Sequence, residues 1–271
     1  MKERIDSIPI NDAMANAGEC PLCFIEKKVE DNALDYVLGS GSSYMEYDTR
    51  EMTDKAGFCR AHFKKMYDYG NTLGNAWILS THYDTVIKEM TEQFKSFKPG
   101  KGKSGFSVGS LIPGGAKSKI KAGASGNTAG ASTNSIVNWI NMRNESCFIC
   151  DNVKQSFADY IRVFFGMYKK DPEFRDKIRQ SQGFCLSHFG VLCEAADENL
   201  NESQLQEFYN ELCPLMLENM KRLKEDVAWL IEKYDYRNKD ADWKNSKDAN
   251  QRAMQKLKGG YHHLPPHQGK K

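Results

Sequence analysis

The sequence of 271 residues lacks long apolar runs, and this absence argues against a membrane-spanning protein. No stretch approaches the roughly 18 consecutive apolar residues that a transmembrane helix needs, so we expect no membrane span. The first residues, from Met1 to Pro9, mix charged and apolar side chains and contain no unbroken apolar core of a secretory signal. A mean hydropathy of −0.65 agrees with both points. We therefore expect a cytoplasmic protein.

The chain also lacks a strong charge of either sign, because 38 Lys and Arg residues oppose 36 Asp and Glu residues. Such a balance predicts no overall attraction to nucleic acid or acidic lipid. Phosphate-binding glycine loops after a strand are missing, as is a Ser, His and Asp order with a nucleophile elbow. These absences lean against an enzyme, although a sequence does not reveal a helical pocket.

Alternating β-branched and polar runs are absent as well, and helical periodicity dominates instead. The clearest pattern places apolar or small residues at steps of three and four at Leu73, Ala76, Ser80, Tyr83, Ile87, Met90, Phe94 and Phe97, and again at Met216, Met220, Leu223, Val227, Leu230 and Tyr234. We predict an all-α fold in which each half ends in a long amphipathic helix. Further helices are expected at about 24 to 38, 151 to 169 and 185 to 197. Pro214 should start or kink its helix rather than lie inside it.

What the sequence does contain is one metal-ligand pattern written twice. The ligand candidates are Cys20, Cys23, Cys59 and His62 in the first copy, and Cys147, Cys150, Cys185 and His188 in the second. The two CxxC motifs begin 127 residues apart (147 − 20), and the two GFCxxH motifs place their cysteines 126 residues apart (185 − 59). Internal duplication is the simplest explanation, and it predicts two similar helical halves.

Metal binding is the best interpretation of these cysteines. Cytosolic thiols are kept reduced, and a CxxC motif combined with a CxxH motif has the spacing typical of metal ligands. Pro21 suits the first position of a helix, which places Cys20 at the cap and Cys23 in the first turn. Gly57 and Gly183 permit the tight turn that delivers the second pair of ligands. Four protein ligands close a tetrahedral shell, which is typical of structural zinc; an iron-sulfur cluster is the alternative.

We expect two zinc ions, each bound within one half, because the residues between Cys23 and Cys59 can form a helical loop that needs no second domain. Pairing across the halves is the alternative, with Cys20 and Cys23 meeting Cys185 and His188. In either case the expected fold is two halves stapled by Cys₃His sites.

The composition changes abruptly between Phe97 and Asn134 to Gly, Ser, Ala and Lys, which is typical of a flexible linker. We therefore divide the chain into a first helical half at 1–96, a linker at 97–133, a second helical half at 134–238 and a C-terminal segment at 239–271. That last segment should contain a short helix and a disordered tail.

Several other residues invite a functional reading that we do not favour. Cys193 and Cys213 lie outside the duplicated pattern, and free cysteine is commonly a small buried hydrophobe rather than a redox switch. His82 lies within an amphipathic helix and is expected to be a helix-face histidine rather than a ligand. The histidines of the tail, at 262, 263 and 267, could bind metal only weakly.

The duplicated motifs, together with the closing segments Tyr234-Asp-Tyr-Arg-Asn238 and Arg252-Ala-Met-Gln-Lys-Leu257, resemble a bacterial family of unknown function whose members come mostly from Firmicutes. The resemblance covers nearly the whole chain apart from the linker and is carried by tandem CPxC and GFCxxH motifs. Phe148 stands where the second CPxC would have proline. The family implies no activity.

Three functions remain as hypotheses. The first is a metal-binding helical module that presents a surface to a protein partner, because the ligation is closed. The second is a thiol or iron-sulfur redox sensor, motivated by cysteines at helix starts. The third is a nucleic-acid-binding regulator, which rests on the linker lysines between 98 and 121 and on the lysines of the tail.

Overall fold

The computed structural model describes residues 5–41, 43–98 and 134–268, and its regular structure there is helical without any strand. The all-α prediction is therefore confirmed. The helices are α1 (Ile8–Asn16), α2 (Pro21–Leu38), α3 (Tyr47–Ala56), α4 (Arg60–Tyr69), α5 (Thr72–Ser96), α6 (Ser135–Glu145), α7 (Phe148–Lys170), α8 (Pro172–Gln180), α9 (Leu186–Asn199), α10 (Glu202–Lys233) and α11 (Ala249–Lys258). The helices expected at 24 to 38, 151 to 169 and 185 to 197 correspond to α2, α7 and α9. Most of the expected linker, residues 99–133, lies outside the described residues.

The two halves contain the same order of helices. In each half a CxxC motif opens a long helix (α2 or α7), a short helix follows (α3 or α8), a CxxH motif opens the next (α4 or α9), and a long helix ends the series (α5 or α10). The predicted long amphipathic helices are thus α5 and α10. Pro214, however, lies inside α10. The prediction that it would not lie inside its helix was therefore wrong.

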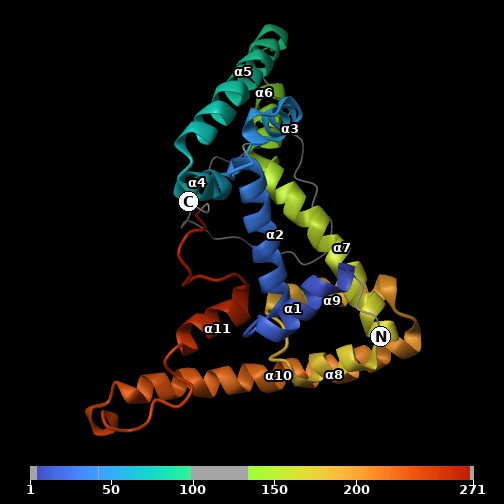
Figure 1. Ribbon diagram of the computed structural model, residues 1–271, viewed down its shortest axis with the longest axis vertical. Helices are drawn as coiled ribbons and strands as arrows, with labels where there is room; N and C mark the ends of the chain where they lie inside the picture. The colour runs from blue at the N-terminus through green and yellow to red at the C-terminus, as the bar shows by residue number, and fades with distance from the viewer. Residues whose placement is uncertain (1–4, 42, 99–133, 269–271) are drawn as a thin grey trace.

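The centre of the molecule is the pair α2 and α7, which lie side by side and run in opposite directions (Figure 1). Hydrophobic packing joins the halves along this pair. The larger core combines Leu22 and Ile25 of α2 with Phe164 and Phe165 of α7, all of them at most 2% exposed. The smaller core joins Leu34 and its neighbours in α2 to residues at the start of α7. Each core therefore depends on both halves.

Aromatic rings fill the larger core. The Phe164 ring makes edge-to-face contacts with Phe165, Phe174 and Phe184 at centroid distances of 5.4, 5.2 and 5.9 Å. Such contacts add to the burial of the rings themselves. At the two ends of the molecule, α10 forms the base and α5 extends away at the opposite tip (Figure 1).

The C-terminal helix α11 is anchored by a buried lysine. Lys256 is fully buried, and its Nζ donates to the carbonyl oxygens of Glu19, at 2.9 Å, and of Gln182. The Glu19 carboxylate lies 3.4 Å from the same Nζ and accepts two hydrogen bonds from Arg222, at 2.6 and 2.8 Å. Because buried charges need partners, this network fixes α11 against the segments that precede Cys20 and Gly183.

The chain after α11 passes from the base towards α4 (Figure 1). His267 lies within the segment that the sequence predicts to be a disordered tail. Its Nε2 donates to Asp35 Oδ1 at 2.9 Å, and its ring lies 5.7 Å from that of Tyr69.

Candidate metal centres

The eight candidate ligands form two groups, and each group combines both halves of the chain. Centre A consists of Cys20, Cys23, Cys185 and His188, and centre B consists of Cys59, His62, Cys147 and Cys150. In both groups the four ligand atoms lie within 4.8 Å of one another. The presence of two Cys₃His groups is as predicted. The favoured pairing within each half was wrong, and the alternative pairing across the halves is the one that the structure contains.

The distances inside each group are those of a tetrahedral ligand shell. At centre A the Cys23 and Cys185 sulfurs lie 3.7 Å apart, and at centre B the Cys59 and Cys150 sulfurs lie 3.8 Å apart. A tetrahedron with metal-sulfur bonds of about 2.3 Å has edges of about 3.8 Å between its sulfurs.

The histidines complete both shells through Nδ1. His188 Nδ1 lies 3.3 to 3.4 Å from the three sulfurs of centre A, and His62 Nδ1 lies 3.2 to 3.3 Å from those of centre B. With a metal-nitrogen bond of about 2.0 Å, the ideal edge is about 3.5 Å. The donor sets therefore fit one tetrahedral ion each.

All four motifs lie at the N-terminus of a helix. The first cysteine of each motif occupies the N-cap, as Cys20, Cys59, Cys147 and Cys185 do for α2, α4, α7 and α9. The second ligand of the motif follows three residues later, on the same face of the helix. Two helix N-termini thus converge on each centre, where their partial positive charge would offset the net negative charge of three thiolates with a divalent cation.

Two glycines shape the turns before the CxxH motifs. Gly57 has φ of +65° and Gly183 has φ of +73°, in the region that side chains with a Cβ avoid. At Gly57 an added Cβ would come within 2.8 Å of the His82 ring. The predicted role of these glycines is therefore confirmed.

Groups around the histidines distinguish the two centres. At centre B, His62 Nε2 donates to Glu30 Oε1 at 2.9 Å, and Lys65 pairs with the other oxygen of Glu30 at 2.5 Å. At centre A, His188 Nε2 lies 3.6 Å from Glu26, outside hydrogen-bonding distance, and its ring lies 5.1 Å from that of Phe157. A carboxylate on the far nitrogen orients a metal-binding imidazole.

The spacing of these two acids from the CxxC motif is visible in the sequence. Glu26 and Glu30 follow Cys23 by three and seven residues, which places all three side chains on one face of α2.

The ligand side chains of centre B shift one another's pKa values. Burial lowers the pKa of His62, but hydrogen bonds with Cys147 and Glu30 outweigh it and raise the pKa to about 10. Burial raises the pKa of Cys147, whereas its hydrogen bond with His62 lowers the pKa to about 6. For Cys150, burial and the Cys147 thiol both raise the pKa, to about 12. Three sulfurs at this distance do not all ionise unless a cation joins them.

The ligand side chains of centre A also shift one another's pKa values in opposite directions. The Cys185 pKa is lowered by hydrogen bonds from Cys20 and Cys23, whereas that of Cys23 is raised by its hydrogen bond with Cys185. Burial lowers the pKa of His188, but hydrogen bonds with Cys185 and Cys20 raise it to about 10.

The centres differ in their access to solvent. All four ligands of centre A are buried, whereas at centre B Cys150 is exposed and Cys59 is partly exposed. A cleft of about 920 Å³ lies between the centres and is lined by ligands of both, including His62, His188 and Cys150, with Leu264 and His267 of the C-terminal segment along it.

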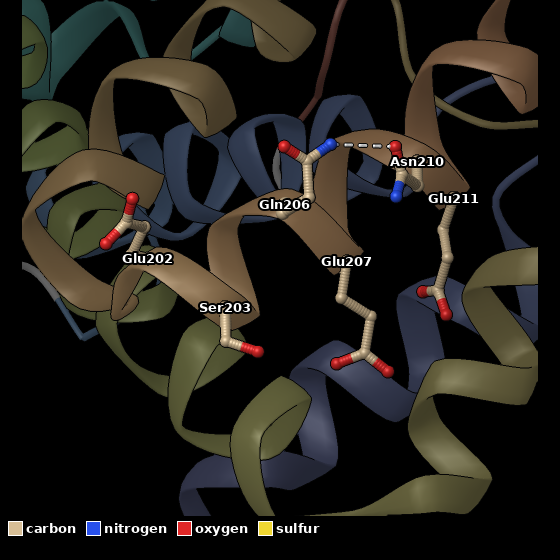
Figure 2. A pocket seen from close by; sticks show the side chains of 6 residues that line it. All are labelled: Glu202, Ser203, Gln206, Glu207, Asn210 and Glu211. Atoms are coloured by element: carbon tan, nitrogen blue, oxygen red, sulfur yellow. Dashed lines mark hydrogen bonds between the residues drawn. The ribbon is translucent and has the colours of Figure 1, made fainter.

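A second depression lies on the surface of α10 and shows no ligand chemistry. Figure 2 shows its six lining side chains, which all come from that helix, with Gln206 donating to Asn210 at 2.9 Å. Glu207 and Glu211 accept hydrogen bonds from Arg175 and Arg179, so this is a solvated helix face.

Three residues that the sequence sets apart lie outside both centres. His82 Nδ1 donates to the carbonyl oxygen of Asp54 at 2.9 Å, as expected of a helix-face histidine. Cys193 is partly buried, and burial raises the pKa of its thiol. Cys213 is exposed, so the expectation of a buried hydrophobe was wrong at that position.

The fold and these centres define a class of all-α protein with two Cys₃His groups arranged as metal ligands. A family model described as "Family of unknown function (DUF6062)" matches residues 1–264, and the chain belongs to this family. The expected membership of a family of unknown function is thereby confirmed. Comparison with curated proteins and with solved structures returns no match. Among the described residues, no helix combines the length and apolar character that crossing a bilayer requires.

Proposed function

We propose that this protein is a cytoplasmic zinc protein in which two structural Cys₃His centres hold a helical scaffold that binds a protein partner. One observation carries the proposal: both centres offer four protein ligands at tetrahedral spacing. A catalytic zinc site retains a position for water, whereas a structural site is closed by four protein ligands. Closed ligation therefore supports a structural role over a catalytic one.

The distances between the ligand atoms favour zinc over a cluster. In a [4Fe–4S] cluster each thiolate binds a different iron, and in a [2Fe–2S] cluster only two protein ligands share an iron, so some ligand atoms lie farther apart than the edge of a single coordination shell. At both centres, by contrast, the histidine Nδ1 lies 3.2 to 3.4 Å from all three sulfurs, which corresponds to one shared ion. Thiolate and imidazole ligands in tetrahedral arrangement suit zinc.

The positions of the centres support a role as staples. Centre A joins the start of α2 to the start of α9, and centre B joins the start of α7 to the start of α4. Because α2 and α7 run in opposite directions, the centres bind the two ends of the same helix pair. Metal binding would then contribute directly to folding, as in other structural zinc sites.

Elemental analysis of natively purified protein tests this proposal. We expect two zinc ions per chain, no iron and no visible absorbance. Removing zinc with a strong chelator should lower the thermal midpoint of unfolding and reduce helical circular dichroism, and adding zinc back should restore both. Stoichiometric iron with sulfide, or full helicity and an unchanged midpoint in the metal-free protein, would contradict it.

A thiol redox sensor is the second candidate, and the exposure of Cys150 in centre B favours it. A peroxide would take two electrons from two thiolates of the centre, such as Cys59 and Cys150, to form one disulfide. The peroxide would be reduced to water, with protons from solvent, and the zinc ion would be released. Mild peroxide should then release one zinc per chain, and a dithiol reductant should restore binding. Release of both ions together, or of neither, would argue against it.

Nucleic-acid binding remains the third hypothesis. The lysines on which it rests lie, apart from Lys98, outside the described residues. A salt-dependent shift on DNA or RNA that disappears when residues 98–121 are deleted would support it.

A further inference from the structure

The outer part of α5 carries an uncovered apolar stripe, which we name the α5 seam. Its members are Tyr83, Ile87, Met90 and Phe94, which are 60, 57, 36 and 57% exposed. They follow one another at steps of four, three and four residues, which is the a and d spacing of a coiled coil. Apolar residues at this spacing predict a helix partner along the stripe.

The neighbouring faces of α5 are already occupied within the chain. Towards α3, His82 bonds to the Asp54 carbonyl oxygen. Towards α6, Glu89 accepts hydrogen bonds from Trp139 Nε1 at 2.9 Å and from Arg143 Nε at 2.8 Å. The α5 seam lies one residue further around the helix from these positions, and no described helix covers it. The helix is therefore fixed in orientation by α3 and α6 while its seam faces outwards.

We propose that the α5 seam pairs with the same seam of a second copy of this chain, in antiparallel orientation. In an antiparallel pair each a position meets a d position, so Ile87 would meet Met90 of the second copy, and Phe94 would meet Tyr83. The pairing is self-complementary about a two-fold axis, as a closed dimer requires. Beside the seam Asp84 would face Thr91, so like charges do not meet.

The position of the seam favours this orientation. The outer part of α5 extends from the rest of the molecule at its tip (Figure 1). An antiparallel pair puts the two bodies at opposite ends of a contact about 16 Å long, from the rise of 1.5 Å per residue between positions 83 and 94. A parallel pair would instead bring both bodies to the same end.

The area available is that of a small specific interface. Residues of this size each present about 200 Å² when fully exposed, so their exposed fractions correspond to roughly 400–500 Å² per copy. Both copies together would bury about 800–1,000 Å² from the seam alone, and flanking side chains would bring the total close to the lower limit of specific interfaces, about 1,200 Å². This agrees with a reversible dimer.

This inference deepens the proposed function, because it names the interaction surface and the partner. Sedimentation analysis of the full-length protein over a range of micromolar concentrations tests it, with zinc measured on the same samples. We expect a reversible monomer–dimer equilibrium. Ile87→Glu should weaken the dimer by about tenfold or more, because an unpaired charge would be buried, and should leave zinc content unchanged.

Leu217→Glu is the matched control. Leu217 is 58% exposed, like Ile87, but it lies on α10, so its replacement should leave the dimer intact. A monomeric wild-type protein that retains both zinc ions would overturn this inference and leave the proposed function standing. Dimerisation that appears only after residues 99–133 are deleted would show that the chain covers its own seam, and it would overturn the inference too.

A rescue experiment tests the register. Ile87→Glu and Met90→Lys should each weaken self-association, but an equimolar mixture should form mixed dimers, because antiparallel pairing places Glu opposite Lys. Failure of the mixture to associate, or an undiminished dimer in both single variants, would refute the antiparallel seam.

Discussion

Pairs of cysteine substitutions distinguish the observed ligand pairing from pairing within a half. Cys20 and Cys185 belong to one centre in the structure, whereas Cys20 and Cys59 belong to different centres. The double variant Cys20→Ser/Cys185→Ser should therefore retain one zinc per chain, and Cys20→Ser/Cys59→Ser should retain none. Pairing within the halves predicts the opposite result for both variants.

The expected loss of stability follows from the length of chain that each centre closes. Cys23 and Cys185 lie 162 residues apart, and Cys147 and His62 lie 85 residues apart. In the chain-entropy model, cross-links of these lengths restrict the unfolded chain by about 5.1 and 4.6 kcal/mol, compared with about 3.8 kcal/mol for Cys23 and Cys59, which lie 36 residues apart (59 − 23). A folded domain is stable by only about 5–15 kcal/mol, so loss of either centre should greatly lower the unfolding midpoint.

The assay is elemental analysis after removal of loosely bound metal, with circular dichroism to verify that each variant is folded. Two further variants provide the mirror-image control: Cys59→Ser/Cys147→Ser should keep one ion, and Cys147→Ser/Cys185→Ser should keep none. Retention of one ion in Cys20→Ser/Cys59→Ser, with none in Cys20→Ser/Cys185→Ser, would refute the cross-half assignment.

Four further predictions follow from single features of the structure. Glu30→Gln should weaken metal binding at centre B by about 10- to 100-fold in chelator competition, because the histidine loses its orienting carboxylate; an unchanged affinity would contradict this. A chelator with a colour indicator should remove the ion of centre B first, since Cys150 is exposed and centre A is buried; simultaneous release would argue otherwise. Phe164→Ala should cost about 3–5 kcal/mol in denaturant unfolding, because it leaves a cavity among packed rings. Burial raises the pKa of Glu89, but hydrogen bonds from Arg143 and Trp139 outweigh it and lower the pKa. The folding stability that the ionised Glu89 carboxylate contributes is complete above its ordinary pKa of 4.5. It is lost as the pH falls through the lowered pKa of the folded protein. Glu89→Gln should therefore reduce the loss of stability in acid, by under about 1 kcal/mol since the carboxylate is partly exposed.

The local chemistry of the ligands could be predicted because it depends on neighbours in sequence. Pro21 and the cysteine before it define a helix start, and Gly57 supplies the turn before the next motif. Spacings of three residues then put both ligands of each motif on one helix face. None of these features depends on how the helices pack.

The pairing of the motifs could not be predicted in this way, because it depends on distance in space. Helix α2 has 18 residues and therefore carries the chain about 27 Å from Cys20, whereas the 10 residues of α3 return at most about 15 Å. The second half repeats this imbalance with 23 residues in α7 and 9 in α8. In the structure the CxxH motif of the first half meets α2 at Glu30, about two helical turns beyond Cys23, and not at Cys23 itself.

The buried network around Lys256 also depends on tertiary structure. Glu19 and Lys256 are 237 residues apart in the sequence, and nothing in the sequence distinguishes them from ordinary charged residues at the surface. They are buried together only because α11 packs against the segments that enter centre A. The same holds for His267, which meets Asp35 across 232 residues.

By itself, the sequence determined the helical class, the eight ligand candidates and their positions at helix starts, because hydrophobic period, capping and ligand spacing act within a few residues. Tertiary structure alone decided which ligand candidates lie together in one group. Antiparallel packing of α2 and α7 buries apolar side chains from both halves and brings the start of each helix to the CxxH motif of the other half. Burial in two shared cores offsets the greater loop-closure entropy of the longer connections.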